Sequence, residues 1–318
     1  MQAISSTSSV VTHLTYSMEI LIRNEPPPPK PMNPTQSIPT DRVERSFPRP
    51  PEADRRADYT DRMPVYPILH LRPPYTPGAT SVMVREVDVT KIVPGSVLAL
   101  HLTARNVDWT AFSETVRRLR SRMPAVPVVL SLGPDVTDGL YLAGQATRVS
   151  VRAVVAGSAP LGESLRRPLT STDGLGNDVV EWLSLFGIRM TATVSQLIAQ
   201  IFTEAPRYTE VGSLLRSMGA AESSTRFRFR KKGLPAPSRW LQAARALHAA
   251  LLIQMEPGKS ILSHACTLGY ADHSALCHQM KRVFGTTPAA VRETLGWEWL
   301  LERWVRKEIL GRRHAVIR

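Results

Sequence analysis

Cysteine is scarce in this chain, and its scarcity narrows the classes of protein to which the chain can belong. The 318 residues include two cysteines, Cys266 and Cys277, which are too few for a disulfide framework and lack the Cys/His spacing of a zinc site. No apolar run reaches the ~18 residues that span a bilayer. The start of the chain also lacks the basic region and long apolar core of a signal peptide. We therefore expect a cytoplasmic protein that binds no metal, no cofactor and no membrane.

Acidic residues are few relative to basic ones, and the imbalance is local. The formal net charge is +13 and the isoelectric point is about 10.3. From Arg207 onward there are about 19 lysines and arginines against about 8 acidic residues, so nearly all of the excess lies in the last third. A strongly basic segment favours a polyanionic partner such as nucleic acid or an anionic membrane surface. The candidate functional module therefore lies in the C-terminal third.

The N-terminal segment lacks a sustained helix or strand period. Residues 1–82 are rich in Ser, Thr and Pro and include the run Pro26–Pro29. We expect this segment to be disordered. An alternative is that translation begins at Met83, directly before the first patterned segment, and the composition is compatible with both interpretations.

Residues 83–160 alternate short β-branched apolar runs with a helical pattern. The runs Val97–Leu102, Val126–Leu132 and Val151–Ala156 predict the parallel strands of a small α/β unit. Between the first two, a helix is expected after the cap residue Asp108 and before Pro124. Its apolar face, which we expect to cover the sheet, consists of Trp109, Phe112, Val116, Leu119 and Met123.

The order strand, helix, strand, helix, strand resembles the C-terminal half of a response-regulator receiver domain. A working receiver has a phosphate-accepting Asp after its central strand and a Lys after its last strand. Here residues near His101 and Gly157 occupy those places, so we expect no phosphorylation by that chemistry. A degenerate receiver and an unrelated α/β unit both remain open. Residues 161–206 then predict a helical connector with helices at Asp178–Phe186 and Val194–Thr203.

The segment from Gly269 to Glu293 has the features of a helix-turn-helix unit. Gly269 permits a tight turn after a helix at Ile261–Leu268 that Ser260 can cap, and Asp272 can cap the next helix. That next helix has an apolar face at helical spacing, formed by Leu276, Met280, Val283 and Phe284. Its opposite face presents polar and basic groups to base edges and phosphates, namely His273, Ser274, Cys277, His278, Lys281 and Arg282.

The residues that follow, Gly285, Thr287, Pro288 and Arg292, resemble the end of the signature of AraC/XylS-family transcription regulators. The resemblance covers the segment that we assign as one domain, 207–296. It implies an all-α double helix-turn-helix domain that binds duplex DNA at a promoter or operator, with RNA polymerase as a candidate second partner. We do not expect an enzyme, because Ser131 and Asp135 near one strand end are too few to make a site.

The first helix-turn-helix unit is recognisable but degraded. Thr209 is the expected cap of a helix that runs through Met218, Gly219 makes the turn, and Glu222–Lys231 forms the second helix. Three residues depart from the pattern that the resemblance implies: Ala221 replaces a Ser cap, Thr225 replaces a buried Leu, and Phe227 replaces an Arg on the base-facing side. The candidate DNA contacts here are Ser223, Arg226 and Arg230. We expect this unit to contact mainly phosphates, and the second unit to supply most of the base recognition.

A long helix from Pro237 and Ser238 to about Met255 joins the two units, with Trp240, Ala244, Leu247 and Leu251 along one side. The resemblance implies that this rod holds the two recognition helices in successive major grooves, about 34 Å apart. A monomer could then recognise two direct half-sites, and the oligomeric state remains open.

The remaining expectations concern packing and the competing function. Residues 297–318 predict an amphipathic helix and tail, in which Trp297, Trp299 and Trp304 close the module or dock it onto the α/β unit. His264 is expected to be partly exposed or strained, and Cys266 to face the core or to be half-buried. The competing hypothesis is a nonspecific DNA-binding or protein-interaction scaffold with an eroded first unit.

Overall fold

The computed structural model describes residues 67–75, 82–84, 87–102, 108–133, 139–149, 151–156 and 161–311. The predicted disorder of residues 1–66 lies outside this range. For Ile68–Leu71 the prediction of disorder is wrong, because these residues form a strand that pairs with Val97–Leu100. The apolar run is too short to show a period, and Ile68 and Leu71 are buried only because the sheet forms around them.

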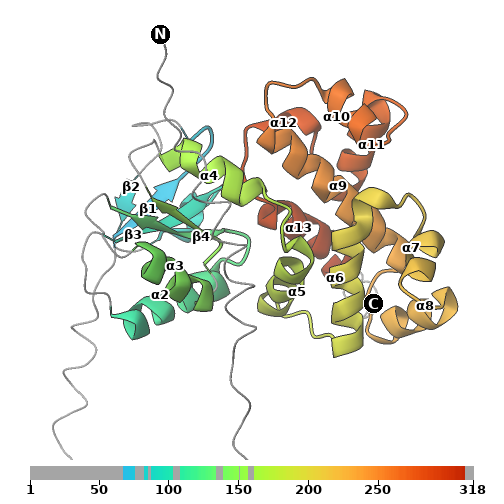
Figure 1. The fold of residues 1–318 in the computed structure, drawn as a ribbon, viewed down its shortest axis with the longest axis horizontal. Helices are drawn as coiled ribbons and strands as arrows, with labels where there is room; N and C mark the ends of the chain where they lie inside the picture. Colours follow the sequence, from blue (N-terminus) through green and yellow to red (C-terminus); the bar gives the residue numbers. More distant parts are fainter. Residues whose placement is uncertain are drawn as a thin grey trace, which may run out of the picture. The chain divides into compact units, whose positions relative to one another are not determined.

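The described strands form one sheet in the order β2-β1-β3-β4-β5 (Figure 1). β3 pairs in parallel with β4, and β4 with β5, whereas β1 runs antiparallel to both of its neighbours. The strands are β1 (Ile68–Leu71), β2 (Val82–Val84), β3 (Val97–Leu102), β4 (Val128–Leu132) and β5 (Ala153–Ala156), with a 3-10 turn, η2, at Val89–Lys91. The three predicted strands are confirmed as parallel, although β4 and β5 each begin two residues later than predicted.

Helices cover both faces of the sheet, which explains why β3 and β4 are mostly apolar, with His101 and Ser131 as the exceptions. The helices are α2 (Trp109–Arg122), α3 (Gly139–Arg148) and α4 (Leu161–Thr170). Leu98, Leu100 and Leu102 share a buried cluster with residues of α2 and α3, including Phe112. On the other face, residues of β3 and β4 pack with Leu165 of α4. The cap of α2 is as predicted, because Asp108 accepts hydrogen bonds from the backbone N–H groups of Thr110 (3.0 Å) and Ala111 (3.1 Å).

The receiver interpretation gains no support from the sheet. A doubly wound sheet of that type is mostly parallel, whereas β1 and β2 run antiparallel here. The side chain of His101 lies beside Ser131 on the adjacent strand β4, with 3.2 Å between His101 Nδ1 and Ser131 Oγ. Gly157 and Asp135 lie outside the described residues.

The rest of the described chain is helical. Its elements are α5 (Leu175–Leu185), α6 (Ala192–Glu204), η3 (Ala205–Arg207), α7 (Val211–Ser217), α8 (Glu222–Lys231), α9 (Pro237–Met255), α10 (Ile261–Thr267), α11 (His273–Phe284), α12 (Pro288–Arg292), α13 (Glu298–Val305) and a π-helical turn, η4 (Arg306–Leu310). Residues from α5 to η4 share one hydrophobic core. The two helices expected in the connector, α5 and α6, therefore pack in the same core as the basic module.

The long helix α9 lies at the centre of this core (Figure 1). Trp240 near its start packs edge to face against Phe202 of α6, Phe229 of α8 and Trp304 of α13, with ring centroids 4.6–6.4 Å apart. Such aromatic pairs add about 0.5–1.5 kcal/mol each beyond the burial of their area. Because α9 makes buried contacts with helices on several sides, it fixes the orientations of those helices.

The tryptophan-rich segment both closes the helical core and docks it against the sheet. Trp304 packs on Trp240, and Trp297 lies beside Trp182 of α5, with ring centroids 6.2 Å apart. The junction is also held by Tyr75, whose hydroxyl donates to Gly95 O (2.5 Å) and accepts from the backbone N–H of Leu295 (2.8 Å). Trp304 thus lies in the helical core, and Trp297 also lies under the guanidinium of Arg152, which precedes β5, at 5.8 Å from the ring centre.

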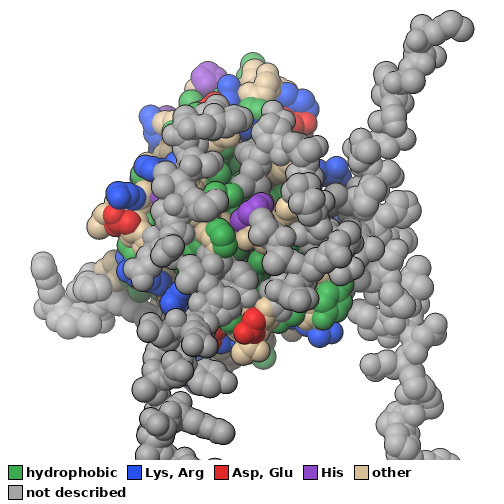
Figure 2. All heavy atoms as spheres, turned by 90° about the vertical axis from the view of Figure 1, so that its left-hand side faces the viewer, with side chains coloured by type: hydrophobic (Ala, Val, Ile, Leu, Met, Phe, Trp, Pro, Cys, Tyr) green, Lys and Arg blue, Asp and Glu red, His purple; other side chains and the backbone are tan. Residues whose placement is uncertain are grey.

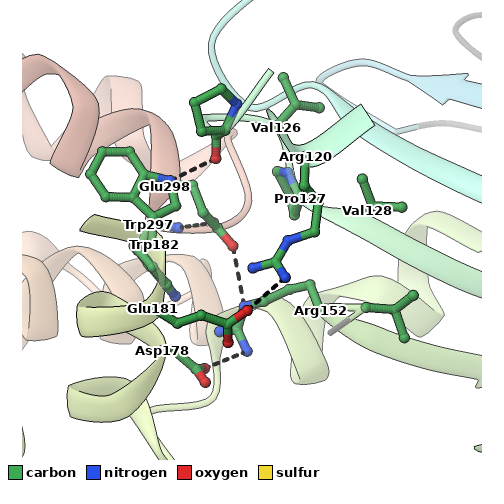
Figure 3. A pocket seen from close by; sticks show the side chains of 12 residues that line it. Arg120, Val126, Pro127, Val128, Arg152, Asp178, Glu181, Trp182, Trp297 and Glu298 are labelled. Carbon is green, nitrogen blue, oxygen red and sulfur yellow. Dashed lines mark hydrogen bonds and ion pairs between the residues drawn. The ribbon is translucent and has the colours of Figure 1, made fainter. Parts of the chain in front are cut away.

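Ion pairs fill the polar part of this junction around a cavity of about 190 Å³ (Figure 3). The guanidinium of Arg152 reaches Asp178 (3.1 Å) and Glu298 (3.2 Å), and Arg120 reaches Glu181 (2.7 Å). Burial raises the pKa of Glu298, and the nearby Arg152 opposes that rise. Two guanidinium groups and three carboxylates are therefore paired with one another at this cavity.

Candidate nucleic-acid interface

The second helix-turn-helix unit, α10 and α11, has the local geometry that its sequence predicts. Gly269 adopts a left-handed conformation (φ 70°) that favours glycine, and the backbone N–H of Tyr270 donates to Ala265 O (2.9 Å) to close the turn. Ser260 Oγ accepts from the N–H of Ser263 (3.1 Å), and Asp272 Oδ1 accepts from the N–H of Ala275 (2.7 Å). Both predicted caps are confirmed, and they fix where α10 and α11 begin.

α11 buries one side and exposes the other. Its apolar residues Leu276, Met280, Val283 and Phe284 are buried in the helical core. Opposite them, the candidate DNA contacts Ser274, His278, Lys281 and Arg282 are exposed, while His273 is exposed in the first turn and Cys277 is half-buried. The predicted sides of the helix are confirmed, and the contact of these residues with DNA remains a prediction. We call Ser274, His278 and Lys281 the α11 stripe, because their spacing of four and three residues aligns them along the outermost face.

The first unit, α7 and α8, repeats the same turn. Gly219 is left-handed (φ 64°), and the N–H of Ala220 donates to Leu215 O (2.8 Å). The cap residue of α7 is Glu210 rather than the predicted Thr209, and it makes no side-chain cap bond. The chain is still extended at Glu210 (φ −117°, ψ 134°), so the helix begins too late for the Thr209 hydroxyl to cap it.

α8 spans Glu222–Lys231 as predicted, and its cap residue Ala221 makes no side-chain bond. Thr225 is fully buried, and its hydroxyl donates to Ala221 O (2.9 Å), which satisfies the polar group in a place where an apolar residue was expected. Phe229 is buried beside it. Ser223, Arg226, Phe227 and Arg230 are exposed. We call Ser223, Phe227 and Arg230 the α8 stripe.

The two stripes occupy the same places in their helices. Counted from each cap residue, Ala221 and Asp272, Ser223 corresponds to Ser274, Phe227 to His278, and Arg230 to Lys281. In each helix the stripe lies opposite the buried residues, as the helical period requires. Each unit therefore presents a hydroxyl, a planar ring and a cation in the same order.

Positive charge is denser on α8 than on α11. The exposed Arg226 (63 % of its side chain) pairs with Glu222, while Arg228, Arg230 and Lys231 are also exposed. On α11, the exposed Arg282 donates to Gln279 Oε1 (2.7 Å), and Lys307 of η4 donates to the backbone oxygen of Arg282 (2.6 Å). By contrast, on the face drawn in Figure 2 the described Lys and Arg side chains are scattered among acidic and apolar ones.

Arg245 links the two units through α9. Its Nη1 donates to Tyr208 O (2.7 Å), just before α7, and its Nη2 donates to Leu268 O (3.2 Å), at the end of α10. Its guanidinium also lies 5.5 Å from the centre of the Tyr270 ring in the turn before α11. The sequence analysis did not single out Arg245. The sequence did contain a sign of its role, because Arg245 is a charged residue placed between apolar residues of the long helix.

The residues that carried the family resemblance hold the end of the second unit together. Gly285 ends α11 in a left-handed conformation (φ 66°). Thr287 Oγ1 accepts from the N–H of Ala290 (3.3 Å), and Pro288 is buried at the start of α12. Arg292 Nη2 donates to Lys259 O (3.1 Å), which ties α12 to the segment between α9 and α10.

Two predictions about α10 are wrong. His264 is buried (1 % exposed) rather than partly exposed, and its Nε2 lies 3.3 Å from Glu256 O. Cys266 is exposed rather than core-facing, because the buried side of this short helix is formed by His264 and Ala265. Within the described parts of the chain, no group of three or more His, Cys, Asp or Glu residues could hold a metal ion. None of the described helices is long and apolar enough to cross a membrane.

Comparison with known proteins agrees with this geometry. The family described as a helix-turn-helix domain matches residues 214–294, about a quarter of the chain, from within α7 to just beyond α12. No curated protein and no solved structure matches the chain. Residues 214–294 are therefore a helix-turn-helix domain of the AraC type, the kind of domain with which transcription regulators bind DNA.

Proposed function

We propose that this protein is a sequence-specific transcription regulator that binds promoter or operator DNA with both helix-turn-helix units. α8 and α11 occupy two successive major grooves, about 34 Å apart. The observation that carries this proposal is the pair of equivalent exposed stripes, Ser223–Phe227–Arg230 and Ser274–His278–Lys281, on two helices held by one buried rod. A nonfunctional remnant would have no reason to present a hydroxyl, a planar ring and a cation in the same register on both helices.

Affinity and specificity come from different side chains in this proposal. Arg226, Arg230, Lys281 and Arg282 neutralise phosphates, which releases counterions and makes binding strongly dependent on salt. Ser274 and His278 hydrogen-bond base edges in one groove, with His273 and Cys277 beside them, and Ser223 does so in the preceding groove. Hydrogen bonds to base edges distinguish one base pair from another, whereas phosphate contacts only position the protein.

One polypeptide is sufficient for this arrangement. Arg245 bonds to the segment before α7 and to the end of α10, so a single guanidinium restrains both units. Rigid spacing by α9 replaces the two-fold symmetry with which dimeric helix-turn-helix proteins space their half-sites.

The experiment that tests the proposal is a titration of the full chain with a duplex selected from a random library and with a scrambled duplex, each at two salt concentrations. We expect both affinities to fall steeply with salt, and the selected duplex to bind at least about 10³-fold more tightly than the scrambled one at physiological salt. A ratio near one would instead favour a nonspecific DNA-binding or interaction scaffold. The observation that speaks for this second candidate is the missing side-chain cap of α8.

A further inference from the structure

Phe227 is exposed in a place where a phenyl ring has no packing role. Its exposed fraction is 56 %, while Thr225 and Phe229, its neighbours along α8, are fully buried. Because Phe227 lies on the opposite side of the helix from these two residues, its ring cannot turn into the core. A single exposed apolar residue is ordinary on a protein surface. What distinguishes Phe227 from other exposed apolar residues is its position on α8.

Phe227 lies at the centre of the α8 stripe. Phe227 takes the place in α8 that His278 takes in α11, with a serine one turn before it and a cation one turn after it in both helices. The proposed function, on which this inference rests, puts His278 against base edges. The same docking puts the phenyl ring of Phe227 against base edges in the other groove.

A phenyl ring has neither a conventional hydrogen-bond donor nor an acceptor, so on a base edge its best partner is an apolar group. In the major groove the apolar group on a base edge is the 5-methyl of thymine, which aromatic and other apolar side chains contact. The guanidinium of Arg230 lies 5.9 Å from the centre of the Phe227 ring. A cation beside the ring can bind a phosphate while the ring faces the base.

We propose that Phe227 recognises the 5-methyl group of thymine, so that the first unit selects a thymine at the centre of its half-site. This inference changes the role expected from the sequence, in which replacing Arg by Phe removes a base contact. The first unit then contributes base recognition as well as phosphate contacts, through an apolar contact in place of a polar one.

The test replaces each thymine of the selected duplex, one at a time, by deoxyuridine. Deoxyuridine pairs with adenine as thymine does and lacks only the methyl group. Burying one methyl contributes about 0.8 kcal/mol, so we expect one thymine at which the replacement weakens binding of the full wild-type chain about fourfold. The variant Phe227→Ala should bind the two duplexes equally, and Phe227→Leu should retain part of the difference.

Leu262→Ala is the matched control. Leu262 is a similarly exposed apolar residue (52 %) on α10, outside both stripes, so this variant should show the same loss on deoxyuridine replacement as the wild type. Thermal unfolding of the variants should be unchanged, because both side chains are exposed.

Three results would overturn the inference, and the failure of Phe227 alone can be told apart from the failure of the proposed function. A wild-type chain that prefers the selected duplex but loses no affinity at any deoxyuridine refutes the role of Phe227 alone. The same is true if every loss persists in Phe227→Ala. If no selected duplex binds more tightly than scrambled DNA, the proposed function fails, and the inference fails with it.

Discussion

His278 is the residue on which base recognition by the second unit depends most. Its ring is exposed at the centre of the α11 stripe, on the side opposite the buried Leu276 and Met280. We expect His278→Ala to reduce the preference for selected over scrambled DNA roughly tenfold, since one good base contact is worth about 1–3 kcal/mol. Binding to scrambled DNA should be unchanged, because phosphate contacts remain.

The measurement is a pair of binding titrations, with Thr267→Ala as the control, since Thr267 is exposed on the neighbouring helix α10 outside the stripe. Equal losses of affinity on selected and scrambled DNA would assign His278 to phosphate or packing contacts and contradict its role in base recognition.

Individual residues were predictable where a local interaction decides their role. Asp108, Ser260 and Asp272 cap helices as expected, because the carboxylate or hydroxyl binds N–H groups two or three residues away. Burial was not predictable in the same way. His264 is buried because its ring reaches the backbone of Glu256 before the helix begins, and nothing in the local sequence indicates that contact.

At the scale of the element, α8 is a recognition helix that begins without a side-chain cap. Its cap residue Ala221 accepts no N–H through a side chain, whereas Asp272 caps α11. We predict that Ala221→Ser, which adds a cap without adding charge, stabilises the protein by about 1 kcal/mol, and that Asp272→Ala destabilises it by a similar amount. Urea unfolding measures both changes. An unchanged or lower stability of Ala221→Ser would show that α8 has no room for the cap.

The spacing of the two units is a property of α9 and Arg245. We predict that Arg245→Met, which keeps the apolar stem and removes both hydrogen bonds to backbone oxygens, relaxes the spacing requirement. The wild type should bind about tenfold or more weakly when one base pair is inserted between the half-sites, because rigid docking fixes their separation. The variant should lose less on the same insertion.

This comparison separates positioning from mere stability, since a general loss of fold weakens binding at every spacing alike. Arg189→Met is the control, because Arg189 is exposed in the segment between α5 and α6. A variant Arg245→Met whose spacing profile matches that of the wild type would contradict the positioning role.

Long, strongly patterned elements were predictable and short ones were not. α2, α9 and α11 have clear periods or caps and are confirmed. α4 was missed because Pro168 lies inside it, and proline usually ends a helix. The strand β1 was missed because four residues are too few to show alternation.

For the whole molecule, the described sheet begins within the segment that composition alone assigns to disorder. β1 pairs with β3, and Ile68 and Leu71 are buried. We predict that removal of residues 1–66 leaves DNA affinity and thermal unfolding unchanged. Removal of residues 1–82, which also deletes β1 and the first residue of β2, should lower the unfolding temperature by several degrees, because apolar burial is lost. Both truncations are compared by thermal unfolding and DNA titration. Identical unfolding of the two would mean that β1 contributes nothing to the sheet.

The docking of the sheet onto the helical core could not be predicted in detail. Arg152 follows β4 and α3 in the chain, whereas Glu298 starts α13, yet the two side chains meet at 3.2 Å. No local pattern pairs residues so far apart in sequence. The tryptophans of the last segment did indicate packing of this kind, because indole rings at such density are seldom left exposed.

The most direct test of the central claim is selection from a random duplex library with the full chain, followed by sequencing of the bound DNA. Two functional units on one rigid helix predict two enriched half-sites, repeated in the same orientation with centres about 10–10.5 base pairs apart. A single enriched half-site would show that one unit alone recognises sequence, and an unenriched pool would show that the chain recognises none. Either result would contradict the account.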